Sequence, residues 1–415
     1  MKKTYTLREL GLDEAMLASE HARPSVEIVK KLQQRKHESY IVGGAVRDLL
    51  LGISPKDYDV ATSATPEEIR RIFRRGARII GRRFRLVHVR QGRAMVEVST
   101  FRRRTPKAET ETVGGLQADN TYGSPAQDAL RRDMTINALM LDPVAKTVID
   151  HVRGIDDIRD RLLRVIGDPA TRYDEDPVRM IRILRLAAKL NCEVEPAALR
   201  AIAPAADKLE VISSSRLFEE FKKTVNSGAA YKAFELMRKN KLMHAAMPDG
   251  EKLRREQLQF VRDALRSNDE KFNGGGRNSL SVLLACMYWS LVAPRWREAC
   301  AGGEESTDLL YEMAAEAGLN RNQWVTRMVK SHIMNIWEYQ YRFERIIKDG
   351  RKVRFRPDSY EVKKALELFE LRVRHGEVPA EDKATLDQAL AVDAADVPRK
   401  RPRRRRPRRR AAAAE

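Results

Sequence analysis

Two aspartates two positions apart are the first candidates for chemistry in this sequence. Asp57 and Asp59 flank Tyr58, and in an extended chain alternate side chains project from the same face. Two carboxylates held a few ångströms apart repel each other unless a cation lies between them, and Mg²⁺ with carboxylate and phosphate oxygens suits such a site. An Asp-x-Asp pair is also common in turns, so the pair alone leaves a plain turn as the alternative.

A pair of glycines precedes these aspartates. Gly43 and Gly44 follow the apolar segment Tyr40–Val42, and Arg47 and Asp48 lie in the helix that we expect next. Glycine lets the backbone approach a ligand closely, and the amides at the start of a helix favour phosphate. Neither a P-loop nor a dinucleotide-binding fingerprint is present. A plain strand-to-helix turn also explains the glycines, but the strand after this helix would run beside the first strand and bring the aspartates close to the turn.

A third acidic residue interrupts a strand-like segment further along the chain. Glu97 lies in Met95–Phe101, where its neighbours are apolar. A half-buried carboxylate costs free energy unless it is paired or coordinated. Glu97 is therefore a candidate ligand near the aspartates, and the alternative is an edge position that faces water.

The segment Arg131–Leu139 combines basic, acidic and amide side chains. Asp133 and Asn137 are four residues apart, which is about one helical turn. This spacing suits hydrogen bonds to a ribose or to a base edge.

The segment Thr171–Arg185 begins with acids and Pro177, as the start of a helix does. Arg179 and Arg182 follow on adjoining turns. The structural alternative to a binding site is an acidic cap followed by a solvated arginine face.

The apolar pattern predicts the elements that must position these residues. We expect strands at 40–42, 58–61, 85–89 and 94–101 and helices at 45–51 and 66–74. Thr65, Pro66 and Glu68 form a capping box at the start of the second helix. Residues 105–126 are rich in Gly, Thr, Ser, Asp and Asn and predict a flexible loop or lid. After Asp157 apolar residues recur at three- and four-residue spacing, which indicates helices, and we expect the four tryptophans there to be core residues.

Charge and composition narrow the class of protein. The chain has 415 residues, 79 Lys and Arg against 59 Asp and Glu, and a net charge of +20, which favours a polyanionic partner such as nucleic acid. Half of this surplus lies in residues 399–410, where ten of twelve side chains are Lys or Arg. We expect this block to be disordered and to act as an electrostatic arm for RNA or DNA phosphates, rather than only as a solubilising end.

Membrane and secretion signals are not evident in the sequence. No apolar run reaches the roughly 20 residues that a spanning helix needs, and the start lacks the apolar block of a signal peptide. Cys192, Cys286 and Cys300 have no ligand spacing and are expected to be reduced thiols. These features predict a cytoplasmic protein without a membrane span.

Taken in order, five motifs resemble one known family. They are Gly-Gly-x-Val-Arg-Asp, Asp-x-Asp, Val-Glu-Val-Ser-Thr-Phe-Arg, Arg-Arg-Asp-Met-Thr-Ile-Asn-Ala and Glu-Asp-Pro-x-Arg-x-x-Arg-x-x-Arg. Together they are similar to the class II nucleotidyltransferases of the polymerase β superfamily, which include bacterial poly(A) polymerases and CCA-adding tRNA nucleotidyltransferases. The resemblance covers about residues 39–190. The departures, Met134 and Ser99, change packing residues and leave the expected ligands intact.

The resemblance implies an α+β fold with a mixed-sheet head (palm) that carries the metal site, followed by a helical neck and body. The expected boundaries are an N-terminal helical segment at 1–38, the head at 39–157, a neck that recognises the nucleotide at 158–222, an RNA-binding body at 223–345, a helical region at 346–397 and a disordered tail at 398–415.

The family's functional residues carry over onto matching positions. Asp57 and Asp59 would bind two Mg²⁺ ions, with Mn²⁺ as an alternative, and either Glu97 or Asp133 would complete the catalytic set. ATP would contact Gly43, Gly44, Arg47, Asp48, Arg132, Asp133, Asn137, Asp176, Arg179 and Arg182. Single-stranded RNA 3′ ends would contact Arg82, Arg83, Arg403, Arg404, Arg405 and Arg406.

Three features favour the poly(A) polymerase branch, which adds AMP from ATP to RNA 3′ ends without a template and acts in RNA turnover. They are Ile79–Val89, Arg216–Glu220 and the arginine-rich end. A CCA-adding enzyme is the main alternative, and a non-catalytic RNA-binding module of the same fold is less favoured because the acidic residues remain. RNA-degradation proteins are expected as partners.

Overall fold

The structure is a computed structural model of the chain, which divides into two units, Met1–Ala246 and Met247–Glu415. The residues that it describes are 2–81, 85–104, 111–113, 116–118, 121–247, 249–302, 307–322, 324–350 and 356–396. Within these ranges, no helix combines the length and the apolar character that crossing a membrane requires.

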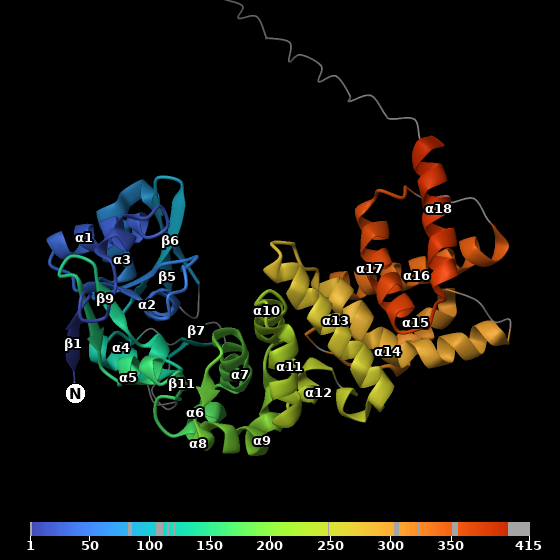
Figure 1. Ribbon diagram of the computed structural model, residues 1–415. Coiled ribbons are helices and arrows are strands. Elements are labelled where there is room, and N and C mark those ends of the chain that lie inside the picture. The colour runs from blue at the N-terminus through green and yellow to red at the C-terminus, as the bar shows by residue number, and fades with distance from the viewer. Residues whose placement is uncertain are drawn as a thin grey trace, which may run out of the picture. The chain divides into compact units, whose positions relative to one another are not determined.

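A mixed β-sheet forms the centre of the head in the first unit (Figure 1). Its strands are β1 (Lys3–Thr6), β2 (Ser39–Val42), β3 (Asp59–Thr62), β4 (Ala77–Ile80), β5 (Leu86–Gln91), β6 (Ala94–Thr100), β9 (Met140–Asp142) and β10 (Thr147–Asp150). In the described part of the chain they stand in the order β1-β10-β9-β2-β3-β6-β5-β4. Strands β3 and β6 are parallel, and the other neighbours are antiparallel.

The register of β3 brings the sequence motifs together. Val42, the residue before the glycine pair, lies opposite Asp59 on the antiparallel neighbour. On the other side, Val60 pairs with Val98 in parallel, so Asp59 and Glu97 each directly precede a paired residue. The prediction that the strand with the aspartates runs beside the strand before the glycines is confirmed.

Short helices cover the head sheet. They are α1 (Arg23–Gln34), α2 (Gly44–Leu50), α3 (Pro66–Phe73), α4 (Pro125–Arg131) and α5 (Gly154–Arg159), with 3₁₀ turns η1 (Glu14–Ala18), η2 (Arg74–Gly76) and η4 (Thr135–Asn137). Helix α1 is amphipathic, and its buried side chains face β2, β3 and β6. Helix α3 begins with the predicted capping box, in which the Thr65 hydroxyl and the Glu68 carboxylate each accept a hydrogen bond from the other residue's backbone N–H.

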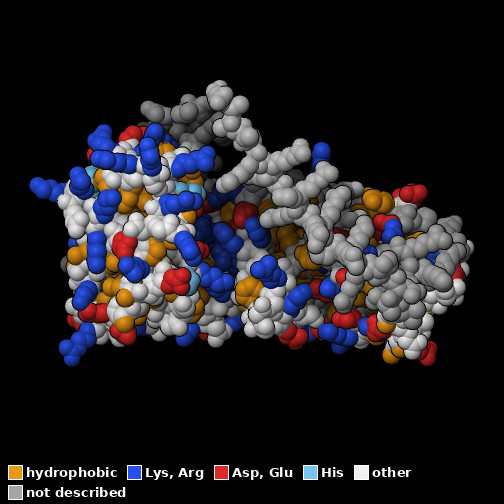
Figure 2. All heavy atoms as spheres, turned by 90° about the horizontal axis from the view of Figure 1, so that it is seen from above, with side chains coloured by type: hydrophobic (Ala, Val, Ile, Leu, Met, Phe, Trp, Pro, Cys, Tyr) orange, Lys and Arg blue, Asp and Glu red, His pale blue; other side chains and the backbone are white. Residues whose placement is uncertain are grey.

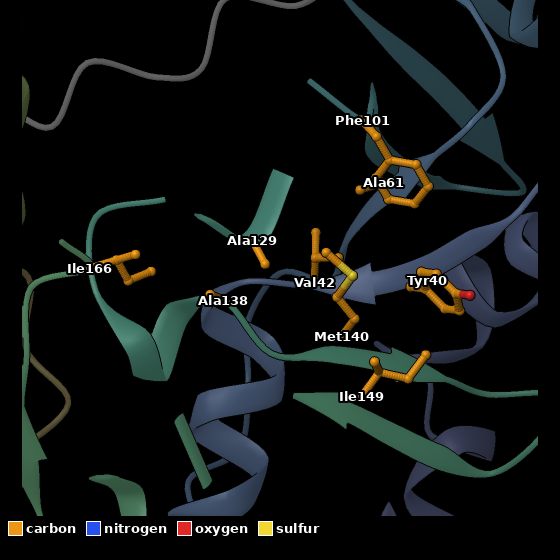
Figure 3. Close-up of a cluster of buried hydrophobic side chains, with 9 residues drawn as sticks. All are labelled: Tyr40, Val42, Ala61, Phe101, Ala129, Ala138, Met140, Ile149 and Ile166. Carbon is orange, nitrogen blue, oxygen red and sulfur yellow. The ribbon is translucent and has the colours of Figure 1, made fainter. Parts of the chain in front are cut away.

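A buried apolar cluster fixes the sheet beneath the motifs (Figure 3). Val42 directly precedes Gly43, and Ala138 directly follows Asn137, so packing in this cluster holds both polar segments in place. The cluster consists of Tyr40, Val42, Ala61, Phe101, Ala129, Ala138, Met140, Ile149 and Ile166.

Helices continue the first unit after the head. They are α6 (Pro169–Glu175), α7 (Val178–Leu190), α8 (Pro196–Arg200), α9 (Ile202–Ala205), α10 (Ser214–Val225), α11 (Ala230–Lys239) and α12 (Met243–Ala246), with the 3₁₀ turn η5 (Ala206–Val211). Helix α7 packs against α6, α10 and α11. Ten of its thirteen residues are buried, including Arg185, so α7 is the central helix of this part.

The second unit is built from longer helices. They are α13 (Arg255–Asn273), α14 (Leu280–Ala301), α15 (Thr307–Glu316), α16 (Arg327–Asp349), α17 (Tyr360–Arg374) and α18 (Ala380–Asp396), with the 3₁₀ turn η6 (Gly250–Lys252). Trp289, Trp296, Trp324 and Trp337 are at most 3% exposed, which confirms that they are core residues. Arg372, itself buried, lies 4.7 Å from the centre of the Trp289 ring and pairs with Glu344 and Glu377.

The structure corrects three details of the predicted elements. Residues 1–38 are not all helical, because β1 pairs with β10 and extends the sheet. In the segment predicted to be a loop, β7 (Glu111–Val113) pairs with β8 (Leu116–Ala118), and α4 begins at Pro125. The strands do not all end before Asp157, since β11 (Leu162–Leu163) pairs with β12 (Glu193–Val194). Each correction involves pairing between segments, which local apolar spacing does not reveal.

Replacing Thr65 with Ala is expected to lower the free energy of unfolding by about 1 kcal/mol, because α3 loses the side chain that accepts the backbone N–H of Glu68 in its first turn. Urea unfolding followed by circular dichroism would measure the loss. Thr65→Ser keeps the acceptor and is the matched control, so equal losses in the two variants would contradict the capping role.

Candidate active site

The aspartates of the Asp-x-Asp motif line a cavity of about 860 Å³ in the first unit. Asp59 opens β3, whereas Asp57 precedes the strand. Glu97 of β6 lines the same cavity, as do His88 of β5 and Lys223 of α10. The structure therefore brings Asp57, Asp59 and Glu97 into one cavity, and Asp133 is not among the residues that line it.

Burial and repulsion between carboxylates together set the electrostatics around Asp59. They raise the pKa of Asp59 to about 6, with burial as the largest cause, the charges of Glu97 and Asp57 adding to the rise and the charge of Arg132 opposing it. Glu97 is not half-buried as expected: its side chain is 57% exposed, and its Oε1 lies 3.5 Å from His88 Nε2. Water therefore solvates Glu97, which removes the burial cost on which its prediction partly rested.

A divalent cation fits this donor set. Among the described residues, no group of three His, Cys, Asp or Glu side chains is already gathered at metal-ligand spacing. The carboxylates are nevertheless close enough for Glu97 and Asp57 to raise the pKa of Asp59. Mg²⁺ and Mn²⁺ favour carboxylate oxygens as ligands. A cation bound between these carboxylates would also relieve their repulsion.

The glycine turn has the conformation that its residues predict. Gly43 has φ +76°, a backbone conformation that residues with a Cβ rarely adopt, and α2 begins at Gly44. A Cβ at Gly43 would lie 3.4 Å from Arg132 Nη1, and one at Gly44 would lie 3.3 Å from Arg47 Nη2. The glycines thus leave room for two guanidinium groups beside the turn.

Arg47 is buried among protein partners. It donates to Asp48 Oδ1 through Nε at 2.8 Å and to Asn137 Oδ1 through Nη1 at 2.7 Å. Asn137 in turn donates to Asp133 Oδ1 at 3.0 Å. Asp133 and Asn137 therefore bond to each other, and the 3₁₀ turn η4 rather than an α-helix joins them. Arg47 in this structure connects the glycine helix to Asp133.

Asp133 is the point at which the head joins the neck helices. Arg182 Nη2 of α7 lies 3.1 Å from Asp133 Oδ2. Burial alone would raise the pKa of Asp133, but Arg182, Asn137 and the Met134 backbone N–H outweigh it, and the pKa lies below its usual value. Asp133 is therefore a buried, ionised partner of Arg182.

The same chain of charges continues into α10. Glu220, which is 5% exposed, lies 3.2 Å from Arg185 and 4.0 Å from Arg182. Lys223, which lines the cavity of the aspartates, lies 3.5 Å from Glu220. Sequence reasoning assigned no role to Glu220 or Lys223. Glu220 of α10 pairs with Arg185 of α7, and the two helices are too far apart in the sequence for this contact to be predicted.

Asp176 and Arg179 meet through the backbone, where the Arg179 N–H donates to the Asp176 carbonyl at 3.1 Å, whereas their described side-chain bonds go to other residues. Asp176 accepts two hydrogen bonds, at 2.9 and 2.7 Å, from Arg216 Nη2 of α10. Arg179 donates to the Arg172 carbonyl at 3.0 Å and lies 3.3 Å from Glu175. Burial lowers the pKa of Arg179. Arg216 is a further residue whose role the sequence reasoning missed.

Arg132 is held by a buried acid that the motifs did not single out. Asp128, which is 1% exposed, accepts hydrogen bonds from Arg131 at 2.9 Å and from Arg132 at 2.9 and 3.1 Å. Its position three and four residues before these arginines is a sequence signal that could have revealed it. These hydrogen bonds from Arg132 to Asp128 hold the Arg132 guanidinium in place. The positive charge of Arg132 in turn lowers the pKa of Asp59.

Basic side chains also gather on the molecular surface. Figure 2 shows a hollow in which Lys and Arg side chains are concentrated. The predicted RNA contacts Arg82 and Arg83, and Arg403 to Arg406 in the tail, lie outside the described residues.

Two family models match the chain. The model described as "Poly A polymerase head domain" matches residues 39–164, and the one described as "Probable RNA and SrmB- binding site of polymerase A" matches residues 191–253. Poly(A) polymerase I of Salmonella typhimurium is 34% identical over 369 residues, which are 84% of this chain and 78% of that protein. This chain belongs to the poly(A) polymerase family of nucleotidyltransferases. The predicted family is confirmed.

Other members of the superfamily are also similar. Poly(A) polymerase I of Haemophilus influenzae is 42% identical over 279 residues, which are 65% of this chain and only 62% of that protein. The CCA-adding enzyme of Bacillus licheniformis is 35% identical over 211 residues, 51% of this chain and 52% of that protein. The chain thus has relatives in both branches.

Solved structures confirm the predicted α+β fold. The Thermotoga maritima CCA-adding enzyme complexed with tRNA has a TM-score of 0.60 at 16% identity and covers 94% of this chain and 86% of that chain. A CCA-adding enzyme in its apo form II has a TM-score of 0.63 at 16% identity, over 97% and 90% of the two chains.

Replacing Asp133 with Asn is expected to destabilise the first unit most near pH 7. The pKa of Asp133 is lowered in the folded protein, so its stabilisation is present above the unfolded-state pKa of about 3.9 and is lost as the pH falls through the folded-state pKa. Calorimetry should therefore show a Tm difference from wild type that shrinks below about pH 4.

Asp174→Asn is the matched control, because Asp174 pairs with Lys208 on the surface and exposed pairs contribute little. A Tm difference for Asp133→Asn that stays constant with pH would contradict the ionised pair.

Proposed function

We propose that this protein adds AMP from ATP to the 3′ ends of RNA without a template, in the cytoplasm. The observation that carries the proposal is the joint position of Asp57, Asp59 and Glu97 in one cavity, in a chain of the poly(A) polymerase family. The match to a probable RNA-binding model at residues 191–253 supports RNA as the acceptor.

Asp57, Asp59 and Glu97 would hold divalent cations, Mg²⁺ or alternatively Mn²⁺. When bound, two such ions activate the attacking 3′-hydroxyl and stabilise the charge of departing pyrophosphate. Position supports Glu97 over Asp133 as the third acid, because Glu97 lines the cavity of the two aspartates, whereas Asp133 is not among its lining residues and pairs with Arg182. Asp133 instead acts as the anchor of Arg182.

Basic groups and backbone amides would hold the triphosphate. The turn at Gly43 and Gly44 allows close approach of a phosphate to the backbone, and Arg132 lies beside it. Phosphoryl transfer depends mainly on position and charge. Arg47 would contact the triphosphate by giving up some of its hydrogen bonds to Asp48 and Asn137 and donating to phosphate oxygens instead.

Without a template, protein side chains must choose the base. The Asp176 carboxylate would accept a hydrogen bond from the base edge, and the Arg179 guanidinium would donate one to it. A site built to make such hydrogen bonds rejects mismatched bases strongly. In the free protein Arg216 occupies both oxygens of Asp176, so base recognition would include sharing or displacing this bond. RNA-degradation proteins are the partners that we propose for an enzyme of this activity.

Extension of a labelled generic RNA and of a tRNA ending in CC, with Mg²⁺ and one nucleotide at a time, tests the activity. We expect long ladders on the generic RNA with ATP alone. Additions of CTP and ATP that stop at CCA on tRNA would identify a CCA-adding enzyme instead, which the 35% identity to such an enzyme makes the second candidate. Extension of neither RNA would favour a non-catalytic RNA-binding module.

Asp59→Asn should remove extension while RNA binding and Tm stay near those of wild type, because the carboxylate is needed for the cations and not for the fold. Gel extension, RNA binding and calorimetry measure the three properties. Glu193→Gln, a change of an exposed acid on β12, is the control. Retention of most of the activity in Asp59→Asn would refute the metal assignment.

Deletion of residues 398–415 should weaken RNA binding and flatten its dependence on salt. Each lost contact with a single-strand phosphate reduces the log–log slope by about 0.7. Affinity measured across a salt series gives this slope, and an unchanged slope would mean that the tail only solubilises the protein.

A further inference from the structure

The β-sheet fixes only one of the two aspartates. Strand β3 begins at Asp59, and its last ladder partner is Val42. Asp57 and Tyr58 precede the strand and have no ladder partner among the described pairings. Because Asp57, Asp59 and Glu97 repel one another, the segment needs another restraint if the carboxylates are to stay together.

A buried serine of α1 supplies a restraint at this point. Ser25 is 1% exposed, and its hydroxyl donates to the backbone carbonyl of Tyr58 at 2.6 Å. This carbonyl belongs to the peptide bond that joins Tyr58 to Asp59. Since the peptide unit is planar, holding the carbonyl fixes the orientation of this peptide and so the direction in which the chain enters Asp59. Asp57 lies one residue further back, on the other side of the buried Tyr58.

The Tyr58 side chain is restrained by burial. It is 7% exposed, and it lies near Ser19, which precedes α1. The Ser19 hydroxyl accepts the backbone N–H of Ala22 at 3.2 Å. The residue between the two aspartates is therefore held at its backbone by the hydrogen bond from Ser25 and at its side chain by packing.

We propose that Ser25 is a positioning residue, which sets the spacing of Asp57 and Asp59 for a divalent cation through its bond to the Tyr58 carbonyl. Residues 19–25 precede the segment that matches the head family model, which begins at residue 39. The inference rests on the proposed function in one respect, namely that these aspartates bind the cation.

The bond acts by preorganisation. Without a cation, repulsion favours wider separation of the carboxylates. If the hydrogen bond from Ser25 were absent, part of the free energy of cation binding would be used to bring the carboxylates together. With the tether, that arrangement exists before the cation arrives. Groups that orient metal ligands typically contribute about 10- to 100-fold in metal affinity, so a loss of this size is expected when the hydroxyl is removed.

Mn²⁺ binding to the full-length protein, measured from the paramagnetic resonance signal of free Mn²⁺ without nucleotide or RNA, is the test. Ser25→Ala should weaken binding by roughly 10- to 100-fold. Ser39→Ala is the matched control, because Ser39 is also fully buried and its hydroxyl hydrogen-bonds Thr62 at 2.7 Å, at the other end of β3. Both variants should lose similar Tm, and only Ser25→Ala should lose Mn²⁺ affinity.

A second pair of variants keeps the test decisive if Ser25→Ala folds poorly. Ser25→Thr and Ser25→Val add the same volume and differ in the hydroxyl. We expect Thr to retain Mn²⁺ affinity and Val to lose it. Equal affinities for Thr and Val, or a loss in Ser39→Ala as large as in Ser25→Ala, would overturn the proposal.

Asp59→Asn separates this inference from the proposed function. If Asp59→Asn removes Mn²⁺ binding and Ser25→Ala does not weaken it, the metal assignment stands and the positioning role of Ser25 is wrong. If Asp59→Asn binds Mn²⁺ as wild type does, the metal assignment itself fails.

Discussion

The ion pair between Asp133 and Arg182 is the interaction on which the arrangement of the site depends. Asp133 lies in the head, and Arg182 lies on α7, the central helix of the neck. Through Asn137 and Arg47 the pair is connected to the glycine turn, and through Glu220 it is connected to α10. A buried charge without a partner is costly, so the head and α7 are held in one register by the need to keep these charges paired.

Charges of opposite sign are separated within the site. Acidic groups repel one another around Asp59, whereas three cations, Arg182, Arg185 and Lys223, pair with the two acids Asp133 and Glu220. A region with excess negative charge attracts cations, and a neighbouring region with excess positive charge attracts phosphates. A nucleoside triphosphate with its metal ions carries both kinds of charge, so it complements both regions together.

Much of the scaffold could be predicted from the sequence, because the signals were local. The capping box at Thr65, the strand before Gly43 and the strand of Asp59 follow from residue type and spacing, and the structure confirms them. What the sequence could not reveal were contacts between distant segments. The partner of Asp176 is Arg216, and the partner of the Tyr58 carbonyl is Ser25. Glu97 was assigned partly from burial that it does not have, since alternation in a strand does not tell which face is covered.

The pairing of β1 with β10 has a consequence for the order of events during synthesis. Lys3 pairs with Asp150, so β1 leaves the ribosome well before its partner strand has been made. At roughly 5–20 residues per second, that delay is about seven to thirty seconds. Until then β1 is an unprotected strand on a nascent chain, and its composition, with Lys3 and two threonines, lessens the tendency of such a strand to associate with others.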